Sequence, residues 1–250
     1  ALSGGDGTNH VTLTKFIEVY GDTPLPKIAL LRGGTMNTIA NGVGVKGNSY
    51  SLITNLVEKY HRGESFIETK RYILNIDKKY GFLFGNGVIH NYLTEYYATG
   101  EPSPTRAFTT LTRGAISALW GGELSQRLFR KFEGKVFIDG EETPYKEFTA
   151  IVAGSVSQIG LGFTPFYKVE EAPERFHIYL ILCSAAQFTS QLHRFYAGKA
   201  PRTDYAPGYL AKEVTFISKR PLLYQLDGDT YKGPKELTLK CGPRLNFILK

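Results

Sequence analysis

A glycine-rich turn near the start of the chain has the residue types that bind phosphate. Gly4, Gly5, Asp6, Gly7 and Thr8 spell GGDGT directly before a predicted helix. Glycines let backbone N–H groups approach phosphate oxygens, and a helix start adds the positive end of its dipole. A carboxylate beside phosphate is repulsive unless it serves a cation or a reacting hydroxyl, so Asp6 indicates such chemistry. The alternative is a tight turn in which Asp6 only caps the helix.

A second turn of the same kind follows the predicted strand KIALLR at residues 27–32. It contains Gly33, Gly34, Thr35 and Asn37, again ahead of a predicted helix start. Each turn alone is ordinary in an α/β protein. Two of them at the ends of neighbouring strands are expected to converge on one ligand at the carboxyl edge of a sheet.

An acidic pair lies late in the chain, where Asp227 and Asp229 flank Gly228 after the apolar segment LLYQL. If the strand continued through Gly228, both carboxylates would face the same side, because side chains two apart in a strand do so. A hairpin turn with both side chains in solvent is the alternative. Asp139-Gly140-Glu141 looks similar and is predicted to be such a turn.

The elements that must position these groups fall into two parts. Residues 9–20 and 49–61 have the apolar spacing of helices, the second with Asn48 or Ser49 at its start and Gly63 at its end. With the strand at 27–32 they indicate an α/β sheet. From residue 68 onwards β-branched and aromatic residues predict a mainly antiparallel β-domain. Its predicted strands are 69–90 (paired), 135–138, 148–153, 176–183, 214–218, 222–226, 236–241 and 246–249, with helices at 108–120, 123–132 and 185–196.

These motifs together resemble the diacylglycerol-kinase catalytic family, which includes sphingosine kinases and bacterial lipid kinases and is distantly similar to NAD kinases. The resemblance implies an α/β nucleotide-binding domain, N-terminally incomplete here, and a larger β-rich, sandwich-like domain for the lipid. We expect the first at residues 1–67, the second at 68–241, and a return to the first at 242–250. It also implies that a strand, a helix and a phosphate loop precede Ala1.

The resemblance further implies an ATP- and Mg²⁺-dependent kinase that phosphorylates a lipid hydroxyl, diacylglycerol- or sphingoid-like. Asp227 is then expected to be the general base, with Asp6 also catalytic. Asp6 and Asp229 are expected to help hold Mg²⁺. The residues expected to bind the nucleotide are Gly4, Gly5, Gly7, Thr8, Gly34, Thr35 and Asn37.

The sequence departs from the family pattern at three points. Thr38 stands where the second turn normally has a carboxylate, and Glu174-Arg175 stands where an Asp-Gly pair contributes to an accessory metal site in some members. Asp229 replaces a glutamate of the late motif, which keeps the charge and shortens the reach. Two alternatives therefore stay open: a kinase for a soluble acceptor such as NAD, and a nucleotide- or lipid-binding protein with weak or no turnover.

The net charge, the cysteines and the aromatic residues limit the classes of partner that this protein is expected to bind. Thirty Lys and Arg against 23 Asp and Glu give a net charge of +7. This charge suits a nucleotide, a nucleic acid or an acidic membrane as a partner as well as it suits plain solubility. Cys183 and Cys241 form no zinc or disulfide framework, as expected in a reducing cytoplasm. Aromatic residues show no RNA-binding pattern, so no nucleic acid is expected. We expect a cytoplasmic protein, peripheral to the membrane, that acts on a membrane lipid; a homodimer stays open.

Overall fold

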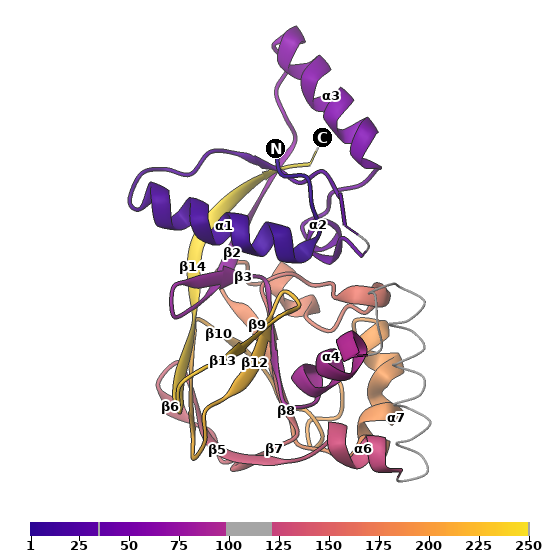
Figure 1. Ribbon diagram of the computed structural model, residues 1–250, viewed down its shortest axis with the longest axis vertical. Helices are drawn as coiled ribbons and strands as arrows, with labels where there is room; N and C mark the ends of the chain where they lie inside the picture. Colours follow the sequence, from indigo (N-terminus) through magenta and orange to yellow (C-terminus); the bar gives the residue numbers. More distant parts are fainter. Residues whose placement is uncertain (35, 99–121, 250) are drawn as a thin grey trace.

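The computed structural model describes residues 1–34, 36–98 and 122–249. Its N-terminal part is drawn at the top of Figure 1. This part contains α1 (Asp6–Tyr20), β1 (Ile28–Ala29), α2 (Thr38–Gly42) and α3 (Ser49–Arg62). β1 pairs in parallel with the end of β14 (Glu236–Ile248), and Leu2 forms a parallel bridge with Leu30. Parallel strands with helices around them agree with the α/β character expected for these residues.

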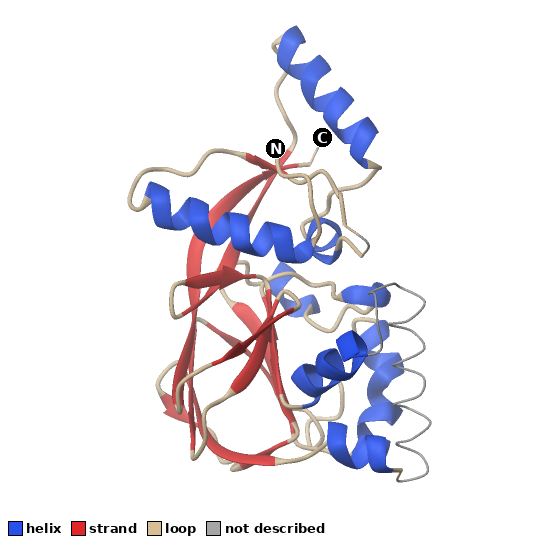
Figure 2. Cartoon of the chain, viewed as in Figure 1, coloured by secondary structure: helices blue, strands red, loops and turns tan. Residues whose placement is uncertain are grey.

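The rest of the described chain forms two antiparallel sheets, drawn in red in Figure 2. The first has the order β3-β2-β14-β11-β5-β6, with β7 also paired to β5. Its strands besides β14 are β2 (Glu68–Ile76), β3 (Lys79–Gly81), β5 (Phe132–Ile138), β6 (Glu141–Glu142), β7 (Glu147–Phe148) and β11 (Glu213–Ser218). The protein is therefore a mixed α/β structure with two antiparallel sheets.

The second sheet has the order β10-β9-β8-β4-β12-β13. Its strands are β4 (Leu83–Asn86), β8 (Ala150–Gly154), β9 (Phe176–Ile181), β10 (Gly208–Ala211), β12 (Leu223–Leu226) and β13 (Asp229–Lys232). Three helices lie beside this sheet in Figure 1: α4 (Val88–Ala98), α6 (Glu123–Leu128) and α7 (Ala185–Tyr196). Short 3₁₀ turns span Gly160–Gly162 and Tyr167–Glu170.

The two sheets pack face to face around an apolar core. Phe84 of the second sheet stacks on Phe216 of the first, with ring centroids 5.5 Å apart. The outer face of the second sheet is also apolar, because Tyr179 and Ile181 pack there with Val88 and Phe195 from α4 and α7. Burial on both faces explains why all six residues of β9 are buried and why its sequence is a continuous apolar run.

Most elements agree with the sequence predictions. Asn48 caps α3 through a reciprocal bond with Ser51, and Gly63 ends it in the left-handed conformation. The predicted strands at 236–241 and 246–249 are one strand, β14, with an irregularity between Cys241 and Arg244, so it crosses residue 241. The predicted helix at 123–132 ends at Leu128, and the predicted helix at 108–120 lies outside the described residues.

Sequence reasoning was wrong about residues 88–90, which begin α4 rather than end a strand. It also missed β13, whereas the helix start predicted after the second glycine turn is present as α2. None of the described helices has the length and apolar character needed to cross a membrane.

Candidate active site

The two glycine turns touch each other. A Cβ atom on Gly34 would lie 2.3 Å from the Cα of Gly5, and one on Gly33 would lie 2.8 Å from the nitrogen of Gly4. No side chain fits at such distances, so the absence of Cβ atoms lets the two turns approach. Thr8 lies beside Gly4. The structure thus brings Gly4, Gly5 and Gly34 together; Thr35 is not among the described residues.

The first turn leaves the start of α1 open. Gly5 occupies the position before the helix, and no side chain among the described residues caps it. The N–H groups of the first helical turn have no partner within a helix and point outward from its end. They meet the requirement for binding phosphate oxygens that the sequence suggested for Gly4 to Thr8.

Asp6 joins the two turns. Its carboxylate oxygens accept one hydrogen bond each from the backbone N–H groups of Thr38 and Ile39, both at 2.9 Å. Thr38, which stands where the resembled pattern has a carboxylate, is buried and contributes its N–H here. Asn37 closes the second turn, because its side chain accepts from the N–H of Gly34 and donates to the Gly34 carbonyl. Asp6 and Asn37 therefore fix the shape of the site.

Asp227 and Gly228 form a two-residue hairpin turn between β12 and β13. Their φ angles of 50° and 97° are both positive, as a type I′ turn requires. The strand does not continue through Gly228, yet Asp227 does not point into solvent either. It is buried, and its carboxylate accepts the N–H groups of Phe82 at 2.9 and 3.0 Å and of Leu83 at 2.8 Å. The hairpin turn considered from the sequence is therefore present, but the solvent exposure expected for its Asp227 side chain is wrong.

Asp229 lies on the other side of the turn, beside the first glycine turn. A Cβ atom on Gly7 would lie 3.6 Å from each Asp229 carboxylate oxygen. No hydrogen bond or ion pair is found for the Asp229 carboxylate within the part of the chain that the structure describes. It is therefore available to a ligand.

Three carboxylates thus gather where the two parts of the chain meet. Burial raises the pKa of Asp227 well above its usual range. The N–H groups of Phe82 and Leu83 oppose this shift, whereas the negative charges of Asp6 and Asp229 add to it. Like charges this close are tolerated where a cation or a proton is expected.

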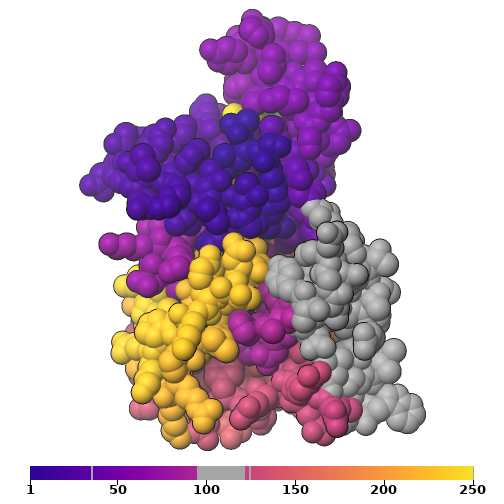
Figure 3. Space-filling model, viewed as in Figure 1, coloured from indigo at the N-terminus to yellow at the C-terminus, as the bar shows by residue number. Residues whose placement is uncertain are grey.

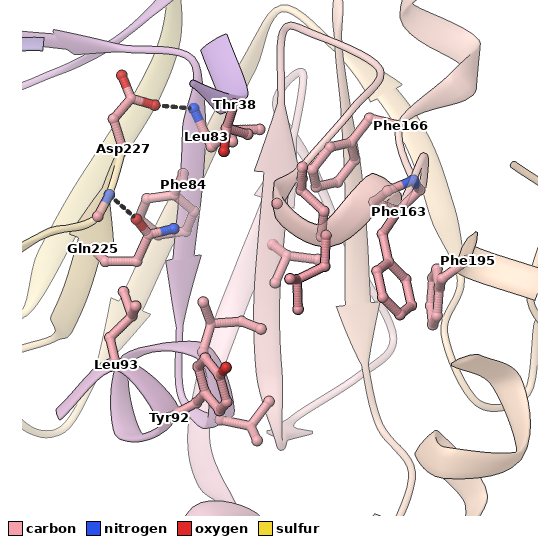
Figure 4. A pocket seen from close by; sticks show the side chains of 18 of the residues that line it. Thr38, Leu83, Phe84, Tyr92, Leu93, Phe163, Phe166, Phe195, Gln225 and Asp227 are labelled. Atoms are coloured by element: carbon pink, nitrogen blue, oxygen red, sulfur yellow. Dashed lines mark hydrogen bonds between the residues drawn. The ribbon is translucent and has the colours of Figure 1, made fainter. Parts of the chain in front are cut away.

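A cavity of about 510 Å³ opens beside these carboxylates. Asp6, Gly7, Thr38, Asp227 and Gly228 line it at one side. Figure 4 shows Asp227 and Thr38 there, with Phe163 and Phe195 on the opposite side. The remaining lining is apolar apart from Thr189 and Gln225, and it comes mostly from the second sheet, from α4, α6 and α7, and from the segment around residues 159–166. Its members include Ile39, Leu83, Phe84, Val88, Ile89, Tyr92, Leu93, Leu128, Val152, Phe166, Ile181, Phe188 and Leu192.

Sequence reasoning did not identify these lining residues. The apolar spacing of Val88, Ile89, Tyr92 and Leu93 is a helical signal that could have located α4. Sequence reasoning also missed Gln225. Its side-chain oxygen accepts the N–H of Gly228 at 2.8 Å and so stabilises the turn.

Of the predicted metal ligands, Asp6 lies in the first glycine turn and Asp229 lies beside Gly7 of that turn. Within the described ranges, no group of three or more acidic, histidine or cysteine side chains could hold a metal ion by itself. Mg²⁺ usually binds through one or two carboxylates together with substrate phosphates and water, so a two-carboxylate site fits that ion.

No protein-family model matches this sequence, and no curated protein is similar to it at a significant level. Solved structures are similar. A proposed diacylglycerol kinase from Bacillus anthracis superposes with a TM-score of 0.72 at 13% identity, covering 98% of this chain and 75% of that one. A diacylglycerol kinase structure from the same organism gives 0.66 at 16% identity, covering 98% and 74%. The chain therefore has, over nearly its whole length, the fold of these bacterial proteins described as diacylglycerol kinases.

Proposed function

We propose that this protein is a kinase that transfers the γ-phosphate of ATP to the hydroxyl group of a lipid. The observation that carries the proposal is the cavity, which is apolar along most of its lining and reaches Asp6 and Asp227 beside the two glycine turns. An acyl chain in the cavity would direct a polar head towards these groups. Mostly apolar pockets with a few polar groups are typical of sites that orient one end of an apolar ligand.

The glycine turns are the phosphate side of the site. Open N–H groups at the start of α1 and the close approach of Gly5 to Gly34 leave room for phosphate oxygens. Asp6 and Asn37 hold the turns in place through backbone hydrogen bonds. Positioning of the reacting groups, together with neutralisation of charge, supplies most of the rate enhancement in phosphoryl transfer.

Asp6 and Asp229 would hold Mg²⁺ together with the phosphates of ATP. The ion supplies neutralisation of the charge on the transferred phosphoryl group. Asp229 suits this role because its carboxylate has no partner among the described side chains. Asp6 has one hydrogen bond on each oxygen, which leaves further lone pairs.

Asp227 is the proposed general base. It lines the cavity and is held in one orientation by Phe82 and Leu83. Burial raises the pKa of Asp227, which makes its carboxylate a stronger base than an exposed one. It would accept the proton of the lipid hydroxyl as that oxygen attacks the γ-phosphorus, while the bond from the γ-phosphorus to the bridging oxygen breaks and ADP leaves.

The cavity favours a lipid over a soluble acceptor such as NAD. A dinucleotide needs hydrogen-bonding partners along its length, whereas this lining is almost entirely apolar. A membrane lipid would require the protein to work at a membrane surface, and the net charge of +7 suits binding to anionic lipid.

The test is transfer of label from radiolabelled ATP to a panel of lipids, with NAD as a separate acceptor. Leu192→Trp on α7 should fill the cavity and raise the KM for the lipid while leaving the KM for ATP unchanged, because Leu192 lines only the apolar part. Ser190→Trp, on the exposed side of the same helix, is the control. Labelling of NAD alone would refute the lipid assignment. Nucleotide binding without transfer to any acceptor would favour the binding-protein alternative.

A further inference from the structure

His10 lies on α1, one helical turn after Asp6, and is buried at 2% exposure. Its Nδ1 is 2.6 Å from the carbonyl oxygen of Tyr80, and its Nε2 is 2.6 Å from the hydroxyl of Tyr231. A carbonyl can only accept, so Nδ1 carries the proton and donates to Tyr80. In a neutral ring Nε2 then accepts the hydroxyl proton of Tyr231. Both ring nitrogens of this buried side chain are therefore engaged in hydrogen bonds.

The Tyr231 end of this contact belongs to the hairpin that carries the acidic pair. Tyr231 lies two residues after Asp229 on β13, so their side chains share one face of the strand. Tyr231 also stacks on Tyr224 of β12, with ring centroids 5.4 Å apart. Movement of Tyr231 would thus be transmitted to both strands of the hairpin. Figure 3 shows the indigo surface of the first residues in direct contact with the yellow surface near the C-terminus.

A separate set of bonds already attaches α1 to β3. The Thr14 hydroxyl accepts the N–H of Tyr80 at 3.1 Å and donates to its carbonyl at 3.3 Å. These bonds hold α1 on β3 but do not reach β13. The bond from His10 to Tyr231 adds a connection between α1 and the hairpin, across 221 residues of sequence.

We propose that His10 is a positioning residue for phosphoryl transfer, which through Tyr231 holds the turn bearing Asp227 and Asp229 against the Gly4–Thr8 turn. The inference rests on the kinase function proposed above. One end of α1 supplies Asp6 and Gly7, and the hairpin supplies the other two carboxylates. A fixed distance between α1 and the hairpin therefore fixes the distance between the phosphate side and the base. Errors of about 1 Å in such a distance reduce the rate of a positioned reaction about a hundredfold.

The kinetic test compares Tyr231→Phe, His10→Asn and His10→Gln. Tyr231→Phe removes only the hydroxyl, and His10→Asn keeps an amide near Nδ1 but loses the group at Nε2. We expect kcat to fall about tenfold in both, equivalent to about 1.4 kcal/mol. The KM for ATP should change much less than kcat, because the glycine turns and the Asp229 side chain are themselves unaltered. His10→Gln places an amide near Nε2 and should recover part of kcat. Unchanged kcat in the first two variants, or equal losses for Asn and Gln, would overturn the proposal.

Tyr209→Phe is the matched control, because its hydroxyl is hydrogen bonded to Tyr145 and it lies on β10, at the opposite edge of the same sheet. It should keep the wild-type kcat. A tenfold loss there would mean that any lost tyrosine hydroxyl slows the enzyme, and the specific role of His10 would fail.

Hydrogen–deuterium exchange separates a failure of this inference from a failure of the kinase function. Backbone amides of residues 229–232 should exchange faster in Tyr231→Phe and His10→Asn than in the wild type or Tyr209→Phe. Unchanged exchange would show that His10 does not hold the hairpin, whatever the activity. If the two variants exchange faster than the wild type, but the wild type phosphorylates no lipid, the lipid-kinase function is refuted. The structural connection between His10 and Tyr231 would then still be established.

Discussion

Replacement of Asp227 by asparagine tests the proposed mechanism most directly, because the chain contains a matched control. Asp139 and Gly140 form the turn between β5 and β6, also with positive φ angles of 49° and 90°. The Asp139 carboxylate accepts two consecutive N–H groups, of Lys212 and Glu213, at 2.8 and 2.9 Å. The two aspartates therefore share a turn type and a hydrogen-bonding role. Only Asp227 lines the cavity.

The folded structure should tolerate Asp227→Asn. One carboxylate oxygen, Oδ1, accepts from both Phe82 and Leu83, so an amide oxygen in its place would keep both bonds. A general base contributes about 10²- to 10⁴-fold to a rate. We expect about a hundredfold loss of kcat, the lower end, because an alcohol needs little help from a base in a loose transition state. Asp139→Asn should leave kcat unchanged.

Stability against pH should change in opposite directions in the two variants. The pKa of Asp227 is raised on folding, so this group stabilises the folded protein fully below its unfolded pKa of about 3.9. That stabilisation is lost as pH rises through the folded pKa, and the free energy of unfolding falls by at most about 1.4 kcal/mol per pH unit. Asp227→Asn removes that loss and should gain stability relative to the wild type as pH rises. For Asp139, partial burial acts to raise the pKa, but the N–H groups of Glu213 and Lys212, with Arg175, outweigh it and the pKa is lowered. Its contribution is therefore present above about 3.9 and lost as pH falls, so Asp139→Asn should be less stable at neutral pH.

The assays are steady-state phosphate transfer from radiolabelled ATP and urea denaturation at several pH values. Asp227 acts in the transition state, so its replacement should lower kcat far more than it changes either KM. A folded Asp227→Asn protein with kcat near that of the wild type would refute the catalytic role. Equal losses in Asp227→Asn and Asp139→Asn would show that the shared turn, and not the position at the cavity, is what activity requires.

Three further outcomes are expected. Asp6→Asn should abolish turnover and lower the free energy of unfolding by about 1–3 kcal/mol, since the N–H of Thr38 or Ile39 loses its acceptor; normal activity in the folded variant, measured by the same transfer assay, would contradict its role. Gly34→Ala should weaken ATP binding in calorimetry, because the new Cβ would lie 2.3 Å from the Cα of Gly5 and force the turns apart; wild-type affinity would exclude this region as the phosphate site. The protein should sediment with anionic vesicles more than with neutral ones at low salt, by about 1 kcal/mol per basic residue near the surface, and equal sedimentation would count against peripheral membrane binding.

Local features of this protein could be read from its sequence. The start of α3 at Asn48 and its end at Gly63 follow from side-chain capping and from the left-handed conformation that glycine adopts easily. The continuous apolar run of β9 reflects a strand that is buried on both faces. The helical spacing of apolar residues in α7 reflects a helix that is buried on one face. The two glycine turns were found because their chemistry depends on neighbouring residues only. The division into domains at residues 67 and 241, and the roles assigned to the site residues, stay predictions.

The tertiary structure decided what neighbouring residues do not specify. Asp227 and Asp139 have the same local sequence pattern and the same turn, and only the pairing of β12 with β4 places one of them at the cavity. The sequence alternatives for Asp227 were a continuing strand and a hairpin turn with its side chain in solvent. The hairpin turn is present, but the side chain is buried and accepts the N–H groups of Phe82 and Leu83, 145 and 144 residues away. His10 and Tyr231 are likewise joined across 221 residues. Contacts at such separations depend on the register of strands and the packing of sheets, and side-chain periodicity identifies which face of an element is buried but not what it is buried against.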